Sequence, residues 1–111
     1  MRVLKIPLEA KEEKDFLREL KKLPRKFITR KMNGQGFRSW PDRLVMGEYG
    51  FTMLIEIKRK IVGKLSPGQE DFFPLLGDMG HQVSVFDDGK EAAAHVWGAF
   101  QKHCEVTEVP V

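Results

Sequence analysis

Two runs rich in β-forming residues lie on either side of a short glycine-bounded turn near the middle of the chain. The runs are Pro41–Met46 and Phe51–Lys58, and the turn is Gly47–Gly50. This pattern is typical of a β-hairpin. Because side chains two residues apart in a strand point to the same face, Glu56 and Lys58 share one face of the second run. Charged side chains are almost never fully buried without a partner, so this pair within an apolar strand requires an explanation.

The register of the hairpin decides what Glu56 faces. If the hairpin closes through that turn, Met46 lies opposite Thr52 and Asp42 lies opposite Glu56. Directly opposed residues have Cβ atoms about 4.5–5.5 Å apart, and opposed like charges repel each other. A divalent cation between the two carboxylates would relieve this repulsion, and Lys58 would lie beside it. A slip of one residue would turn Asp42 to the other face. The hairpin therefore predicts a metal site formed by Asp42 and Glu56.

The remaining pattern of hydrophobic and polar residues predicts helices and one strand on each side of the hairpin. In chain order these are a helix over 8–22, a strand over 26–32, a turn or loop over 33–36, a helix that begins after Ser66 and is kinked or divided at Pro74, a strand over 82–86, and a last helix that follows Asp87-Asp88 and runs through Phe100. The order αβββαβα allows three strands to form an antiparallel meander. The helix that follows then places the fourth strand parallel to the third. We therefore expect an α/β (mixed α+β) fold with one mixed sheet flanked by helices.

Composition narrows the class of protein. The chain has 111 residues with a formal net charge of +3, which fits a single globular domain over residues 1–111 with a mildly basic surface. Its one cysteine, Cys104, permits no internal disulfide and no zinc site of the Cys₄ or Cys₂His₂ kind. No apolar run approaches the roughly 20 residues that span a bilayer. We therefore expect a reducing, intracellular (cytoplasmic) location and no membrane partner.

An ordered series of short segments extends this pattern along the chain. The segments are Ser39-Trp40-Pro41-Asp42-Arg43-Leu44, Glu56-Ile57-Lys58, Gly63-Lys64-Leu65-Ser66-Pro67-Gly68-Gln69 and Gly80-His81-Gln82-Val83. The series resembles the VRR-NUC branch of the PD-(D/E)xK nuclease superfamily, in particular its stand-alone, virus-type members, over about residues 9–95. The family usually has Gly where Ser39 stands. The resemblance implies a restriction-endonuclease-like core and a metal-dependent DNA endonuclease.

We expect the catalytic residues to be Asp42, Glu56, Lys58 and Gln69. Asp42, Glu56 and the backbone carbonyl of Ile57 would bind Mg²⁺ or Mn²⁺, since both ions prefer oxygen ligands. Lys58 would orient the attacking water or stabilise developing charge. Gln69 completes a capping box with Ser66; the resemblance adds a role beside the active site, and the two roles are compatible.

A glutamate of the first predicted helix is a further candidate ligand. Glu13 lies on the same face as the apolar residues of that helix, Glu9 extends the line by one turn, and Glu12 lies at its edge. The resemblance implies an acid from this helix without deciding which one, and Glu13 is our first choice. All three acids also stabilise a helix N-terminus through the macrodipole, so a purely structural role remains open.

Four basic residues are expected to bind the DNA backbone: Arg38, Arg59, Lys60 and Lys64. Trp40 either stacks on a base or packs into the core. The resemblance implies a homodimer and branched DNA such as flaps and four-way junctions. For the dimer contact we expect Trp97 and Phe100 of the last helix, or the first helix exchanged across Leu23-Pro24. Two other interpretations stay open: a catalytically inactive nucleic-acid-binding module, or a structural protein in which the three charged hairpin residues form a salt bridge.

Overall fold

Seven helices and strands and one short 3₁₀ turn make up the fold of this computed structural model, which describes residues 8–34, 36, 38–58 and 65–111. They are α1 (Leu8–Lys21), β1 (Ile28–Lys31), β2 (Arg43–Met46), η1 (Glu48–Gly50), β3 (Thr52–Ile57), α2 (Pro67–Asp78), β4 (Val83–Phe86) and α3 (Gly89–Thr107). The expected order αβββαβα is confirmed.

The four strands form one mixed sheet in the order β1-β2-β3-β4. β1, β2 and β3 are antiparallel neighbours, and β4 pairs parallel to β3 through the α2 crossover. Met46 pairs with Thr52 and Arg43 with Ile55, so the next pair in the same register is Asp42 with Glu56. The predicted hairpin register is therefore confirmed.

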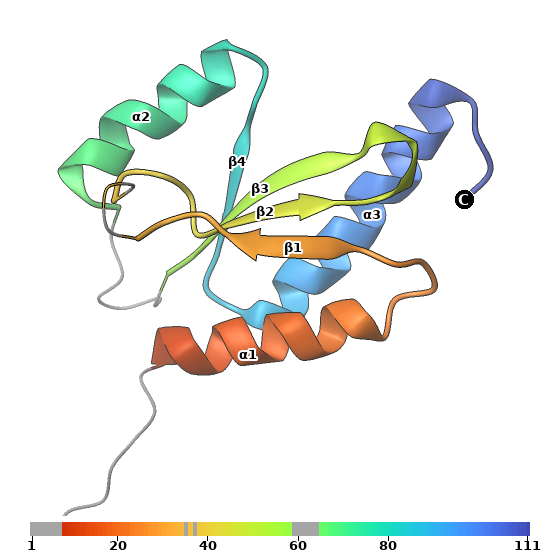
Figure 1. Cartoon of the computed structure of the whole chain (residues 1–111), viewed down its shortest axis with the longest axis horizontal. Helices are drawn as coiled ribbons and strands as arrows, with labels where there is room; N and C mark the ends of the chain where they lie inside the picture. Colours follow the sequence, from red (N-terminus) through yellow and green to blue (C-terminus); the bar gives the residue numbers. More distant parts are fainter. Residues whose placement is uncertain (1–7, 35, 37, 59–64) are drawn as a thin grey trace, which may run out of the picture.

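The two faces of the sheet are covered by different helices (Figure 1). On one face Val45 and Ile55 are fully buried together with Phe16 of α1 and Phe100 of α3 in the main hydrophobic core. On the other face lies α2, where Leu76 and side chains from β2 and β3 line a cleft of about 400 Å³. The main core therefore lies between the sheet and the α1/α3 pair.

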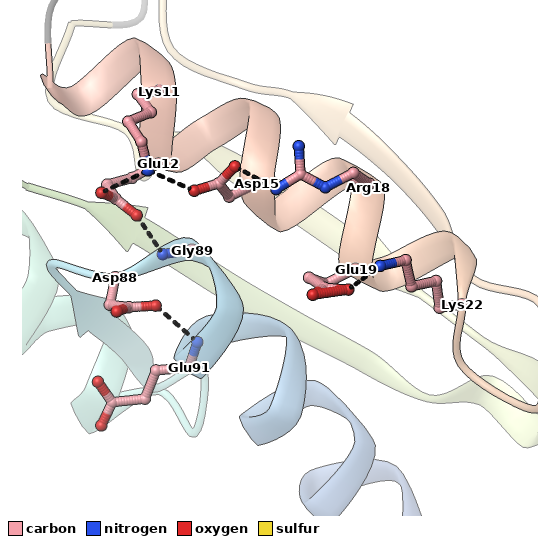
Figure 2. Close-up of polar contacts among 9 residues, drawn as sticks. All are labelled: Lys11, Glu12, Asp15, Arg18, Glu19, Lys22, Asp88, Gly89 and Glu91. Carbon is pink, nitrogen blue, oxygen red and sulfur yellow. Dashed lines mark hydrogen bonds and ion pairs between the residues drawn. The ribbon is translucent and has the colours of Figure 1, made fainter.

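Helices α1 and α3 approach each other closely at the start of α3. A Cβ atom on Gly89 would lie 1.9 Å from the Glu12 carbonyl oxygen, so only glycine fits at this contact. The Gly89 N–H donates a 3.0 Å hydrogen bond to Glu12 Oε1, while Asp88 caps α3 by accepting from the Glu91 N–H (Figure 2). This contact holds α1 against the core.

β1, α2 and α3 differ most from the sequence prediction. β1 is confined to four residues. Pro74 lies inside α2 and does not divide it; it removes the backbone hydrogen bond to the carbonyl of Glu70, an exposed residue that water can reach. α3 continues past Phe100 to Thr107, because Cys104 lies on the same helical face and is 1% exposed within the main core.

Candidate functional site

Asp42 and Glu56 lie opposite each other at the end of the hairpin that is far from its turn, and backbone hydrogen bonds link each side chain to the other segment. The Asp42 N–H donates to Glu56 Oε1 at 3.0 Å, and the Ile57 N–H donates to Asp42 Oδ2 at 2.9 Å. Each carboxylate therefore accepts a backbone hydrogen bond from the partner strand. The strand pairing fixes both side chains on the face that carries α2, as the alternation of the hairpin predicts.

Glu56 is the most deeply buried charged side chain of this pair, with 0% of its surface exposed. Lys58 Nζ lies 3.1 Å from Glu56 Oε2, and the Lys58 side chain is 22% exposed. The Lys58 ammonium is thus the partner of Glu56 Oε2, whereas the backbone and amide donors of the site meet the other oxygen, Oε1. A buried carboxylate oxygen whose partner is a partly exposed cation is a position that a second cation could share.

The electrostatics of the site disfavour two negative charges. Burial raises the pKa of Asp42, and the nearby charge of Glu13 raises it further, whereas the Ile57 N–H opposes the shift. Burial also raises the pKa of Glu56, and the charge of Asp42 adds to this effect against the opposing Lys58. A divalent cation at the two carboxylates would offset both contributions, since it favours the ionised forms.

Gln69 lies at the start of α2 and has two sets of contacts. Its backbone N–H donates to Ser66 Oγ and its Oε1 accepts from the Ser66 N–H, each at 3.2 Å, which completes the predicted capping box. Its amide Nε2 lies 3.3 Å from Glu56 Oε1 and 3.4 Å from the Trp40 carbonyl. The side chain is therefore part of the helix cap and also touches the buried carboxylate.

Ser39 packs against the first turn of α2. A Cβ atom on Gly68 would lie 2.2 Å from Ser39 Oγ. Among the described non-glycine residues only Tyr49 and Glu108 have positive φ, so Ser39 has an ordinary backbone conformation. The hydroxymethyl group of Ser39 is accommodated because its neighbour in α2 lacks a side chain. The departure from the family pattern at this position therefore leaves the bend intact.

The three glutamates of α1 have different surroundings. Glu13 Oε1 accepts two hydrogen bonds from the Arg43 guanidinium, at 2.7 and 3.1 Å. Arg43 is the residue that follows Asp42 in the chain. Glu12 accepts from the Gly89 N–H on the α3 side (Figure 2), and the side chain of Glu9 lies outside the described structure. Within the described part of the chain, no three His, Cys, Asp or Glu side chains converge to hold a metal ion. The structure thus brings Asp42 and Glu56 together as a pair.

Two contacts of the site were absent from the sequence prediction. Asn33, which the sequence indicates only as a turn residue, donates its side-chain amide to Asp42 Oδ1. Arg43 holds Glu13. The strand alternation turns Arg43 away from Asp42, towards α1, and this was readable in the sequence; the Asn33 contact depends on how β1 pairs with β2, which the sequence did not specify.

Of the four basic residues expected to bind DNA, the structure describes Arg38. Arg38 is exposed and lines a hollow with Gly36, Ser39 and Trp40. The Trp40 ring packs on Phe72 of α2 with centroids 5.3 Å apart, and it is half-buried. Arg59, Lys60 and Lys64 lie outside the described residues.

One expected dimer contact is wrong. Phe100 is 0% exposed and lies in the main core, and Trp97 stacks on it with a centroid distance of 5.8 Å while remaining half-buried. The helical spacing of Phe100 fitted either an outer or an inner face, and burial against α1 and the sheet decided for the inner one.

None of the described helices is both long and apolar enough to cross a membrane.

A solved structure described as "VRR_NUC domain" has this architecture. It superposes with a TM-score of 0.68 at 20% sequence identity, and the match covers 84% of this chain and 97% of that one. The chain has the fold of a VRR_NUC domain. No family model and no curated protein matches the sequence. The expected fold, a restriction-endonuclease-like mixed sheet flanked by helices, is therefore confirmed by the structural likeness.

Proposed function

We propose that this protein is a metal-dependent DNA endonuclease that hydrolyses phosphodiester bonds. The observation that carries the proposal is the buried Glu56 carboxylate opposite Asp42, with Lys58 Nζ 3.1 Å from its Oε2. This trio stands at the positions of the Pro-Asp and Glu-x-Lys motif. The VRR_NUC-type fold supports the same reading.

Asp42 and Glu56 fit a hard divalent cation. Both are oxygen donors at one end of the sheet, and burial penalises their ionised forms while no cation is present. Mg²⁺ is commonly bound by one or two carboxylates together with waters and substrate phosphates, so two carboxylates suffice. Asp42, Glu56 and the Ile57 carbonyl would hold Mg²⁺ or Mn²⁺. When bound, the ion would acidify a water molecule and neutralise negative charge on the phosphate.

The other site residues have separate roles in this proposal. Lys58 is partly exposed beside Glu56, so its ammonium can hold the attacking water or the phosphate oxygens as charge develops. Gln69 fixes the orientation of Glu56 through its amide and ties the start of α2 to the site. Arg43 holds Glu13 on the α1 side, close enough for its charge to raise the pKa of Asp42, and Glu13 is the α1 acid that we propose for the site in preference to Glu9 and Glu12.

For the substrate we propose DNA, with a preference for branched forms such as flaps or four-way junctions, and for the assembly a homodimer. Arg38 is exposed and lines a hollow with Ser39 and Trp40 just before Asp42 in the chain, and with Arg59, Lys60 and Lys64 it would contact phosphates. Two-fold pairing would present two Asp42/Glu56 sites to a symmetric junction. Because Phe100 is buried, the dimer contact would involve α1 exchanged across Leu23-Pro24.

The decisive experiment compares cleavage of linear, flap and four-way DNA by wild type and Lys58→Ala with Mg²⁺ and with Mn²⁺. We expect Lys58→Ala to lower kcat by about 10²–10³-fold, since the ammonium acts on charge that develops in the transition state. Lys102→Ala, an exposed position on α3, is the matched control and should cleave normally. Near-normal cleavage by Lys58→Ala would show that the trio is not catalytic.

A second candidate function is favoured by the Lys58–Glu56 ion pair itself, which is also what a catalytically inactive DNA-binding or structural protein would contain. Calorimetric unfolding with and without Mn²⁺ separates the two. In the nuclease proposal Mn²⁺ stabilises the folded protein and Glu56→Gln abolishes that stabilisation. An equal metal response of wild type and Glu56→Gln would remove Glu56 as a ligand and favour the second candidate.

A further inference from the structure

The Asp42 carboxylate is oriented by two donors, one on each oxygen. The Ile57 N–H donates to Oδ2 at 2.9 Å, and the Asn33 amide donates to Oδ1. The first donor belongs to the backbone of β3 and comes with the hairpin. The second is a side chain from the segment between β1 and β2, and no motif of the sequence required it.

Asn33 reaches Asp42 because β1 and β2 are paired up to that point. The Met32 N–H donates to the Asp42 carbonyl at 2.7 Å, which extends the β1–β2 ladder by one residue beyond Lys31 and Arg43. Asn33 is the next residue, is half-buried and is the chain's only asparagine. The pairing therefore brings the residue that follows Met32 alongside Asp42, and the Asn33 amide reaches Oδ1 from beyond the end of β1.

A neutral donor suits this position. A carboxylate has about four lone-pair sites on its two oxygens, so two hydrogen bonds leave others for a cation. The Asn33 hydrogen bond favours the ionised form of Asp42 without placing a positive charge where a metal ion would bind. The nearby cation Arg43 is held by Glu13 instead.

We propose that Asn33 is a positioning residue that holds the Asp42 carboxylate in the orientation needed for divalent-cation binding. The inference rests on the proposed function, since it takes Asp42 as a metal ligand. Removing a residue that orients a metal ligand typically lowers metal affinity by a factor of about 10–100. Asn33 touches neither substrate nor cation in this assignment and acts through Asp42.

A turn-forming role for Asn33 is the competing explanation, because Asn followed by Gly favours turns. The adjacent Gly34 offers a control for it. A Cβ atom on Gly34 would meet nothing within 4 Å, and Gly34 needs no positive φ, so Gly34→Ala alters the same segment without touching Asp42. Asn33→Gly keeps a turn-favouring residue and removes the donor, whereas Asn33→Ser keeps a turn-favouring residue with a shorter hydroxyl donor.

The experiment measures Mn²⁺ dissociation constants by titration calorimetry for wild type, Asn33→Gly, Asn33→Ser and Gly34→Ala, with the metal-free unfolding midpoint of each. We expect Asn33→Gly to weaken Mn²⁺ binding by about 10-fold or more, Asn33→Ser to recover part of the loss, and Gly34→Ala to bind as wild type does. Metal-free midpoints should stay close together, because a turn-favouring residue is kept in both Asn33 variants.

Two results would overturn the inference, and they differ from failure of the proposed function. A wild-type Mn²⁺ affinity retained by Asn33→Gly, or an equal loss in Gly34→Ala, would refute the positioning role while the metal site stands. A wild-type protein that binds no Mn²⁺ would overturn the proposed function and the inference with it.

Discussion

The two faces of β3 are built from the same six-residue strand and have opposite character. Ile55 and Ile57 are 0% and 3% exposed against α1 and α3, and their surroundings are apolar. Glu56, between them in sequence, is equally buried on the face that carries α2. There its contacts are an amide, a backbone N–H and an ammonium group. Depth of burial is therefore the same, and the chemistry of the surroundings separates the two faces.

This difference shows how a small domain divides stability from function. The apolar face removes hydrocarbon surface from water, which is the main stabilising contribution to folding. The other face holds two carboxylates whose ionised forms burial disfavours, a cost that the proposed cation site would explain. Substitutions on the two faces should therefore have effects of opposite kind.

The largest difference in stability is expected between two single substitutions at neighbouring positions of β3. Ile55→Ala should reduce the free energy of unfolding by about 2–5 kcal/mol through the cavity it leaves. Glu56→Gln should leave metal-free stability equal or higher, because the amide removes the buried charge. Denaturant unfolding in the presence of a chelator measures both. A Glu56→Gln variant as unstable as Ile55→Ala would contradict the division between the faces.

The pH dependence of metal-free stability should be of intermediate size. Because burial raises the pKa of Asp42 and Glu56 in the folded protein, the native state binds more protons than the unfolded chain. Stability is then greatest below about pH 4 for these two groups and is lost as pH rises through their raised folded-state values. Glu56→Gln should flatten this decline. Saturating Mn²⁺ should reverse it, since the cation binds the ionised carboxylates.

The smallest effect is expected from two neighbouring cations of β1. Arg30 and Lys31 are both exposed, and alternation places Arg30 on the face of Asp42 and Lys31 on the opposite face. Arg30→Gln should lower the slope of log affinity for DNA against log salt by about 1, while Lys31→Gln should leave it unchanged. Fluorescence anisotropy titrations at several salt concentrations measure the slopes. Equal losses in both variants would mean that the sheet face does not direct DNA binding.

The hairpin and its register were predictable because the turn and the alternation of β3 are local properties of the chain. Met46 opposite Thr52 follows from the length of the turn alone. The capping box of Ser66 and Gln69 and the cap at Asp88 are also local, and both form as expected. For these features, neighbouring residues carry the information.

The surroundings of each side chain were decided by tertiary packing. Helical spacing gave Phe100 a face, but packing against Phe27 and Phe51, far away in the sequence, turned that face inward. The three α1 glutamates are alike in sequence, and contacts 30 and 77 residues away separate Glu13 from Glu12. Asn33 meets Asp42 only because β1 pairs with β2 beyond Lys31. Local patterns determine on which face of a helix or strand a side chain lies. The residue that it contacts depends on how elements far apart in the sequence pack together.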